Sequence, residues 1–165
     1  MSEVGDLLER FRRGGELLRN STAGAEGAEL DYSPGPGQWS LRQLVSHLMD
    51  SEMQSRLRMA SVIAENNPLM VYTDDTHWAE RLDYKRRALP AAIDIFCDLR
   101  EANCEMLQDL PEGVWQRQGT HSKNGPMTLL DLLRHATNHA EEHVSEIRQV
   151  RDHYQNSQKS VGVAK

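Results

Sequence analysis

Residues 128–147 read Thr128-Leu-Leu-Asp-Leu-Leu-Arg-His-Ala-Thr-Asn-His139-Ala-Glu-Glu-His143-Val-Ser-Glu-Ile147. Apolar residues recur three and four positions apart through this segment, which is the pattern of a helix that buries one face. Thr128 can cap the start of that helix, because Asp131 follows three residues later in a capping-box arrangement. We therefore expect one long helix from Thr128 to about Tyr154.

Three segments upstream show the same periodicity. They run from about Val4 to Asn20, from Ser40 to about Glu65, and from about Pro90 to Leu110. Residues that stop helices, namely Pro, Gly and Asn, lie between them. Ser40 is a good N-cap with Gln43 at the capping-box position, whereas Gly14-Gly15 should weaken the first helix in its middle.

The connection between the second and third helices is long, running from Pro68 to Arg87. It contains Tyr72, Trp78 and Tyr84, so we expect it to pack over an end or mouth of the bundle. No segment shows a convincing strand pattern. The sequence therefore predicts an all-α four-helix bundle over residues 1–155 and a polar tail at residues 156–165 that we expect to be disordered.

The composition restricts the partners. The formal net charge is −6 and no dense block of Lys and Arg occurs, which argues against nucleic acid or a membrane as partner. The N-terminal residues are acidic, unlike a secretory signal, and no apolar run is long enough for a membrane span, so we expect a cytoplasmic protein. Cys97 and Cys104 lie about 10 Å apart along one predicted helix, so we expect both to be reduced.

The histidines carry the chemical signal. His135, His139 and His143 follow one another at four-residue steps in the last helix, and His47 lies in the second. Residues four apart project from one face, so two imidazoles of that helix could bind one ion while His47 supplies a third ligand. Spacing alone leaves a second interpretation open, in which the last helix has a polar edge and His47 is unrelated to it.

Helical phase favours two of the three histidines in the last helix. Relative to the apolar face, His143 points roughly 50° away, His139 roughly 90° away and His135 roughly 130° away. We therefore choose His139 and His143 and expect His135 at the rim. His47 lies roughly 120° from the centre of its own apolar face, which suits a cleft between helices.

Two known metal signatures are absent. The motif His139-Ala-Glu-Glu-His143 lacks the Glu directly after the first His that zinc proteases use as a general base. None of the seven histidines has a Glu three residues before it, which excludes the Glu-x-x-His pairs of di-iron bundles. The remaining possibility is a mononuclear site.

Two segments resemble the DinB-like superfamily of four-helix metalloproteins. They are Gly37-Gln-Trp-Ser-Leu-Arg-Gln-Leu-Val-Ser-His47, with Asp50 and Glu52 following, and Gly125–Ile147. The resemblance implies that His47, His139 and His143 bind the metal. Many relatives have a His directly before the last ligand, where this chain has Glu142. We therefore do not expect this chain to use a fourth imidazole at that position.

Polar residues near these histidines have expected roles. Asp50, Glu142 and Glu146 are candidates for orienting the ligand imidazoles. Glu52 and Arg100 interrupt apolar faces, so they should either meet across the bundle or extend to its rim. Aromatic residues Trp39 and Trp115 are interpreted as plugs at the ends of the bundle.

Three neutral imidazoles leave open positions on a divalent ion, which is typical of a catalytic site. Zinc or nickel is the expected metal. The resemblance implies either transfer of a low-molecular-weight thiol to an electrophile or hydrolysis of a small molecule. The alternative is a metal- or small-molecule-binding module of a stress response, without turnover. A homodimer is also plausible, and no catalytic residue is assigned.

Overall fold

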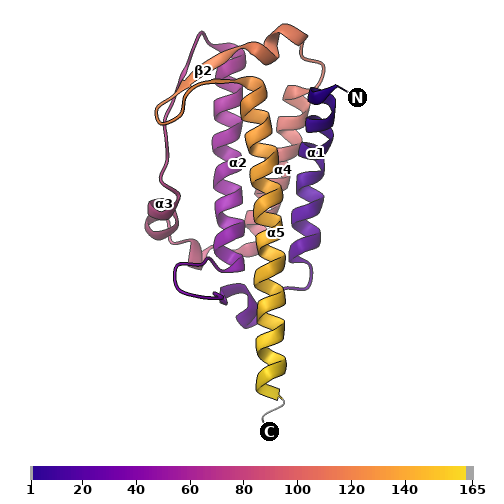
Figure 1. Cartoon of the computed structure of the whole chain (residues 1–165), viewed down its shortest axis with the longest axis vertical. Helices are drawn as coiled ribbons and strands as arrows, with labels where there is room; N and C mark the ends of the chain where they lie inside the picture. Colours follow the sequence, from indigo (N-terminus) through magenta and orange to yellow (C-terminus); the bar gives the residue numbers. More distant parts are fainter. Residues whose placement is uncertain (1, 163–165) are drawn as a thin grey trace.

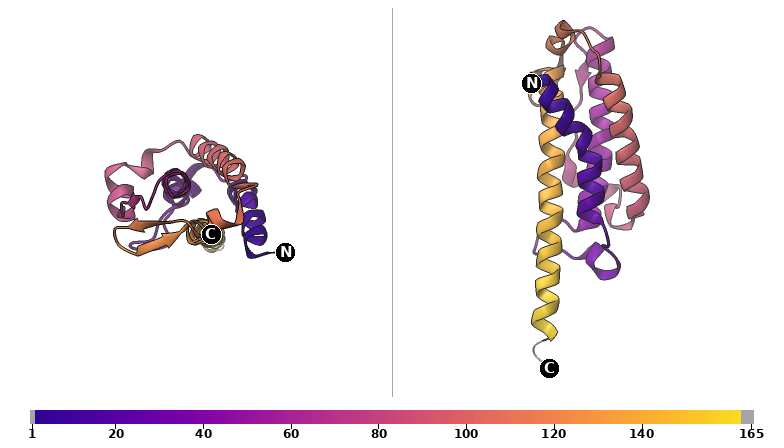
Figure 2. Two further views of the ribbon diagram at one scale, coloured as in Figure 1. Left: turned by 90° about the horizontal axis from the view of Figure 1, so that it is seen from above. Right: turned by 90° about the vertical axis from the view of Figure 1, so that its right-hand side faces the viewer.

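The computed structural model describes residues 2–162, with only the backbone described at 161 and 162. Four long helices lie side by side and form a bundle (Figure 1). They are α1 (Glu3–Thr22), α2 (Leu41–Ala64), α4 (Leu89–Leu107) and α5 (Leu129–Gly162). Each of α1 and α2 packs against both α4 and α5. Helices α1 and α2, which follow one another in the chain, therefore lie diagonally across the bundle (Figure 2). The all-α bundle predicted from periodicity is confirmed.

The helix starts follow the expected capping chemistry. At α2, the Ser40 side chain accepts from the Gln43 amide, and the Gln43 side chain accepts from the Ser40 amide. At α5, the Asp131 amide donates to the Thr128 hydroxyl at 3.1 Å, and the Thr128 amide donates to the Asp131 carboxylate at 3.0 Å. Both arrangements satisfy backbone groups that a helix end would otherwise leave without partners.

The connection between α2 and α4 has structure of its own. It contains strand β1 (Leu69–Met70), the short helix α3 (Asp75–Arg81) and a 3-10 turn, η2 (Tyr84–Arg86). Figure 1 shows it running along the α2 side of the bundle. The turn is fixed from inside, because Tyr84 is fully buried and its hydroxyl donates to Asp50.

The expectation that the chain contains no strand was wrong. Strand β1 pairs in parallel with β2 (Gln118–His121), and β2 pairs antiparallel with β3 (Gly125–Thr128). Two short 3-10 turns, η1 (Gly27–Asp31) and η3 (Glu112–Gln116), complete the described elements. These strands have only two to four residues, which is too short for hydrophobic alternation to be visible in the sequence.

Helix α5 also differs from the prediction at its C-terminal end. It continues to Gly162, whereas we expected it to end near Tyr154 and to be followed by a disordered tail from 156. Residues 155–161 include no proline or glycine that would stop a helix. Residues 163–165 lie outside the described part of the chain.

The glycine pair in α1 has a packing role rather than a weakening one. A Cβ at Gly14 would lie 2.7 Å from Nη1 of Arg100, and one at Gly15 would lie 3.4 Å from the Cys97 sulfur. Both cysteines are free, as expected for thiols on one helix. The missing side chains therefore let α1 and α4 approach closely at the level of Arg100.

The apolar core is divided into two clusters. One cluster lies around Leu44, Phe96 and Ile147, and the other around Phe11, Met59 and Leu133. Buried polar side chains lie between them along the helices, and they include His47, Glu52, Arg100 and Asn103. None of the described helices is long and apolar enough to cross a membrane. The polar layer in mid-bundle is the position at which a site can be built.

Candidate metal centre

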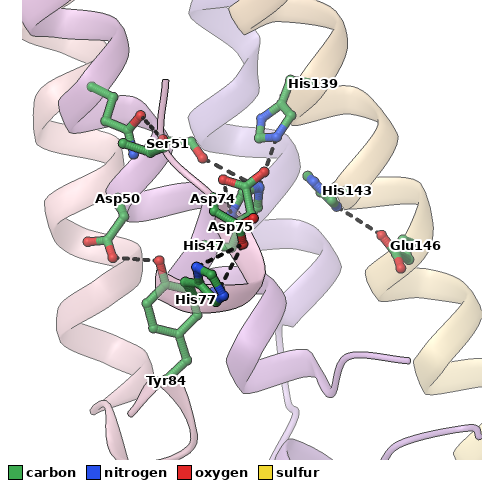
Figure 3. A network of polar contacts seen from close by, with 12 residues as sticks. His47, Asp50, Ser51, Asp74, Asp75, His77, Tyr84, His139, His143 and Glu146 are labelled. Atoms are coloured by element: carbon green, nitrogen blue, oxygen red, sulfur yellow. Dashed lines mark hydrogen bonds and ion pairs between the residues drawn. The ribbon is translucent and has the colours of Figure 1, made fainter. Parts of the chain in front are cut away.

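Three imidazoles converge at the polar layer. His47 comes from α2, whereas His139 and His143 come from successive turns of α5 (Figure 3). The Nε2 atoms of His47 and His139 are 2.9 Å apart. Ring centroids are 4.9 Å apart for His47 and His139, 4.8 Å for His47 and His143, and 4.5 Å for His139 and His143.

The spacing fits one coordination shell. One nitrogen from each of the three rings lies within 4.8 Å of the other two. Metal–nitrogen bonds of about 2.0–2.1 Å place the nitrogens of one shell about 3–4 Å apart. Small side-chain adjustments would therefore let all three rings bind one ion.

His135 lies outside this group. Its side chain is exposed, and its ring centroid is 5.6 Å from that of His139. The geometry thus brings together the pair that helical phase favoured and leaves the third histidine at the rim. His47 is more buried than its phase suggested, at 3% exposure. The ring of Trp39, expected to plug the bundle end, lies 5.0 Å from the ring of His47 and 6.5 Å from that of His143.

Burial keeps two of the imidazoles neutral. Loss of water lowers the pKa of His47 to about 3, with a further contribution from His143. Loss of water, followed by the charges of His143 and His47, lowers the pKa of His139 to about 2. A neutral imidazole has a free lone pair, which is the form that binds a metal.

Two carboxylates lie beside the histidines. Glu146, one of the expected orienting residues, has its Oε2 2.8 Å from Nδ1 of His143. If Nδ1 carries the proton, this hydrogen bond leaves Nε2 of His143 as the ligand atom. The second carboxylate is Asp75, whose Oδ1 lies 3.9 Å from Nδ1 of His47, and whose pKa is raised mainly by burial.

The sequence analysis missed Asp75. It belongs to α3, within the long connection, and Figure 3 shows it close to His47. No periodicity marks such a residue, because its position depends on how a non-repeating segment folds back over α2. The only available signal was the aromatic content of that segment, which led us to expect it over an end or mouth of the bundle, whereas it runs along the α2 side.

The expectation for Asp50 was wrong. Its carboxylate accepts from the Tyr84 hydroxyl at 2.7 Å and from Nη1 of Arg87 at 2.8 Å. Asp50 thus fixes the turn after α3 to α2 and orients no imidazole. Glu142 is exposed, and none of the hydrogen bonds within the described residues joins it to a histidine. It lies one position before His143, so a helix turns it roughly 100° away.

Glu52 and Arg100 meet in the interior. Nη2 of Arg100 donates to Oε2 of Glu52 at 2.6 Å, and Nδ2 of Asn103 donates to Oε1 at 2.6 Å. The two charged side chains are only 3% and 2% exposed. The guanidinium also donates to the Phe11 carbonyl and lies 3.9 Å from the centroid of the Phe11 ring. This network pairs the two charges next to the histidines and, within the described residues, leaves the buried Nε of Arg100 without a hydrogen-bond partner.

A cavity of about 190 Å³ opens beside the centre. Its wall includes His47 and His139, the carboxylate of Asp75, and residues of the β2–β3 hairpin. A small molecule in this cavity would reach the imidazoles directly. The arrangement can therefore hold an ion and present it to a ligand.

Known proteins are similar to this chain over most of its length. The chain is similar to a protein of Oceanobacillus iheyensis described as a "putative metal-dependent hydrolase", with 28% identity over 131 residues, 79% of this chain and 76% of the relative. A protein of Bacillus licheniformis with the same description is 26% identical over 146 residues, 88% of this chain and 81% of the relative.

A solved structure supports the fold. YfiT from Bacillus subtilis, described as a "probable metal-dependent hydrolase with an unusual four-helix bundle topology", superposes with a TM-score of 0.87. It is 22% identical, and the match covers 94% of this chain and 90% of YfiT. The family model of the DinB superfamily matches residues 10–147. This match includes α2, α4, parts of α1 and α5, and the three converging histidines, and the chain therefore belongs to the DinB superfamily.

Proposed function

We propose that the chain is a metal-dependent enzyme that holds one divalent ion with His47, His139 and His143 and hydrolyses a small molecule. The observation that carries this proposal is the convergence of three imidazoles from two helices beside a cavity. The descriptions of the relatives as metal-dependent hydrolases support the reaction class. Zinc or nickel is the proposed ion, since both accept imidazole ligands.

The residues around the centre have distinct tasks. A divalent ion on three neutral imidazoles supplies Lewis acidity and lowers the pKa of a water or thiol at an open position. Glu146 holds the His143 ring through Nδ1. Glu52 and Arg100 neutralise each other, so neither adds a free charge. Trp39 covers the rings of His47 and His143 on another side and limits the access of water.

Asp75 is the carboxylate proposed to receive a proton during the reaction. It lines the cavity, and no lysine or arginine forms an ion pair with it within the described residues. Loss of water around the carboxyl group raises its pKa, although the side chain is 54% exposed, and the raised pKa makes it a stronger base than an aspartate in bulk water. Its Oδ1 is the atom that would hold the proton, near Nδ1 of His47.

The test compares metal-free and zinc-loaded protein in two reactions. Release of nitrophenol from p-nitrophenyl acetate reports hydrolysis, and consumption of cysteine with chlorodinitrobenzene reports thiol transfer. We expect zinc-dependent hydrolysis that is lost in His139→Ala and kept in His153→Ala, a control on the same helix whose exposed side chain lies outside the cavity lining. Zinc-dependent thiol consumption without hydrolysis would show that the reaction is thiol transfer and not hydrolysis. Zinc binding without either reaction would favour a non-catalytic binding module.

A further inference from the structure

The cavity beside the histidines has more positive than negative charge, although the whole chain has a net charge of −6. Three basic residues line it, Arg58, Arg100 and Lys123, against the two carboxylates of Glu52 and Asp75. Arg100 and Glu52 are paired at 2.6 Å and cancel each other. The remaining wall presents two cations and one carboxylate.

Arg58 is a cation without an ion-pair partner within the described residues. It is half-buried on α2, and its Nη2 donates to the Val71 carbonyl at 2.9 Å and to the Gln54 side chain at 3.1 Å. Burial lowers the pKa of the guanidinium, and nearby Asp75 offsets only part of this effect. A desolvated charge is costly unless an opposite charge approaches it.

Two further donors come from the hairpin between β2 and β3. The Lys123 ammonium lies 4.1 Å from the centroid of the Tyr72 ring and forms no ion pair within the described residues. His121 is buried, and its Nδ1 accepts from the backbone amides of Lys123 and Asn124 at 3.2 and 3.1 Å. A neutral imidazole that accepts at Nδ1 carries its proton on Nε2, so His121 is a donor there.

We infer that Arg58, Lys123 and His121 bind an anionic group, a carboxylate or a phosphate, on the small molecule that the histidine centre acts on. Arginine and lysine are the residues that recognise such groups, and His121 adds a neutral donor. His47 and His139 line the same cavity, so an anion held by these donors would leave the rest of the molecule at the centre. The inference rests on the proposed function for the identity of the ligand as substrate.

One of these cavity residues, Arg58, also has a structural role. The bond from Arg58 to the Val71 carbonyl links α2 to the segment after β1. Lys123 has no such bond from its side chain, so Lys123→Gln removes a cavity charge and leaves the framework intact. Lys159→Gln is the matched control, because Lys159 is exposed near the far end of α5 and outside the cavity lining.

The experiment uses metal-free protein, so that its result does not depend on the proposed reaction. Inorganic phosphate and, separately, acetate are titrated at constant ionic strength while the amide resonances of residues 121–124 are followed by NMR. We expect saturable shifts with at least one anion, and binding about tenfold weaker in Lys123→Gln and in Arg58→Gln, as the loss of a charge-assisted hydrogen bond requires. Lys159→Gln should bind like the unmodified protein.

Two results would overturn the inference. One is the absence of saturable shifts with both anions, and the other is equal affinity in Lys123→Gln and Lys159→Gln. If Arg58→Gln does not fold, Lys123→Gln alone decides. The two proposals can also fail separately. If anion binding weakens in Lys123→Gln and the unmodified protein shows no zinc-dependent hydrolysis, the anion site stands and the proposed function is wrong.

Discussion

Replacing Arg100 by methionine should destabilise the protein strongly. The substitution keeps a long apolar side chain between the Phe11 and Phe96 rings but leaves the Glu52 carboxylate with Asn103 as its only partner among the bonds described above. Breaking a buried pair by removing one charge costs about 3–5 kcal/mol. For a chain of this size, that corresponds to a fall in Tm of roughly 6–20 °C.

The double variant Glu52→Met/Arg100→Met provides the sharper comparison. It removes both charges, so the cost should fall to about 1–3 kcal/mol, the cost of leaving the Asn103 amide without an acceptor. Urea unfolding followed by circular dichroism at constant pH measures both values. A loss of less than about 1 kcal/mol in Arg100→Met, or a double variant no more stable than the single one, would contradict the buried pairing of Glu52 with Arg100.

Three smaller effects follow from the same packing. Gly14→Ala should lower the free energy of unfolding by about 1–3 kcal/mol, because its Cβ would lie 2.7 Å from Arg100 Nη1; an increase in urea stability would contradict the close approach of α1 and α4. Tyr84→Phe should cost about 1–2 kcal/mol by removing a buried donor to Asp50, and an unchanged midpoint would exclude that bond as a stabiliser. Hydrogen bonds from the capping threonine hold the pKa of Asp131 below its usual value, so its stabilisation is present at neutral pH and is lost as the pH falls through the folded-state pKa. Asp131→Asn should therefore melt below the unmodified protein at pH 7 and approach it as acid protonates the Asp131 carboxylate, whereas a gap that does not change with pH would argue against the ionised cap.

Local chemistry made much of the framework predictable. The caps at Ser40 and Thr128 form as expected because capping depends on residues three positions apart. Helical phase also separated His139 and His143 from His135, since a regular helix fixes the direction of each side chain. These features require no knowledge of distant parts of the chain.

Features that depend on tertiary contacts were not predictable. The sheet joins strands of two to four residues from separate parts of the chain, and no local pattern marks them. Asp75 reaches the histidines only because the connection after α2 folds back over that helix. Asp50 was misassigned for the same reason, because its partners Tyr84 and Arg87 belong to that connection.

The most direct test of the metal centre is the metal content of four forms of the protein. Each is loaded with zinc, dialysed, and measured by elemental analysis beside a protein assay. We expect about one ion per chain in the unmodified protein and in His135→Ala, and clear loss in His47→Ala and in His143→Ala. Full zinc content in either of these last two variants would contradict the three-histidine centre.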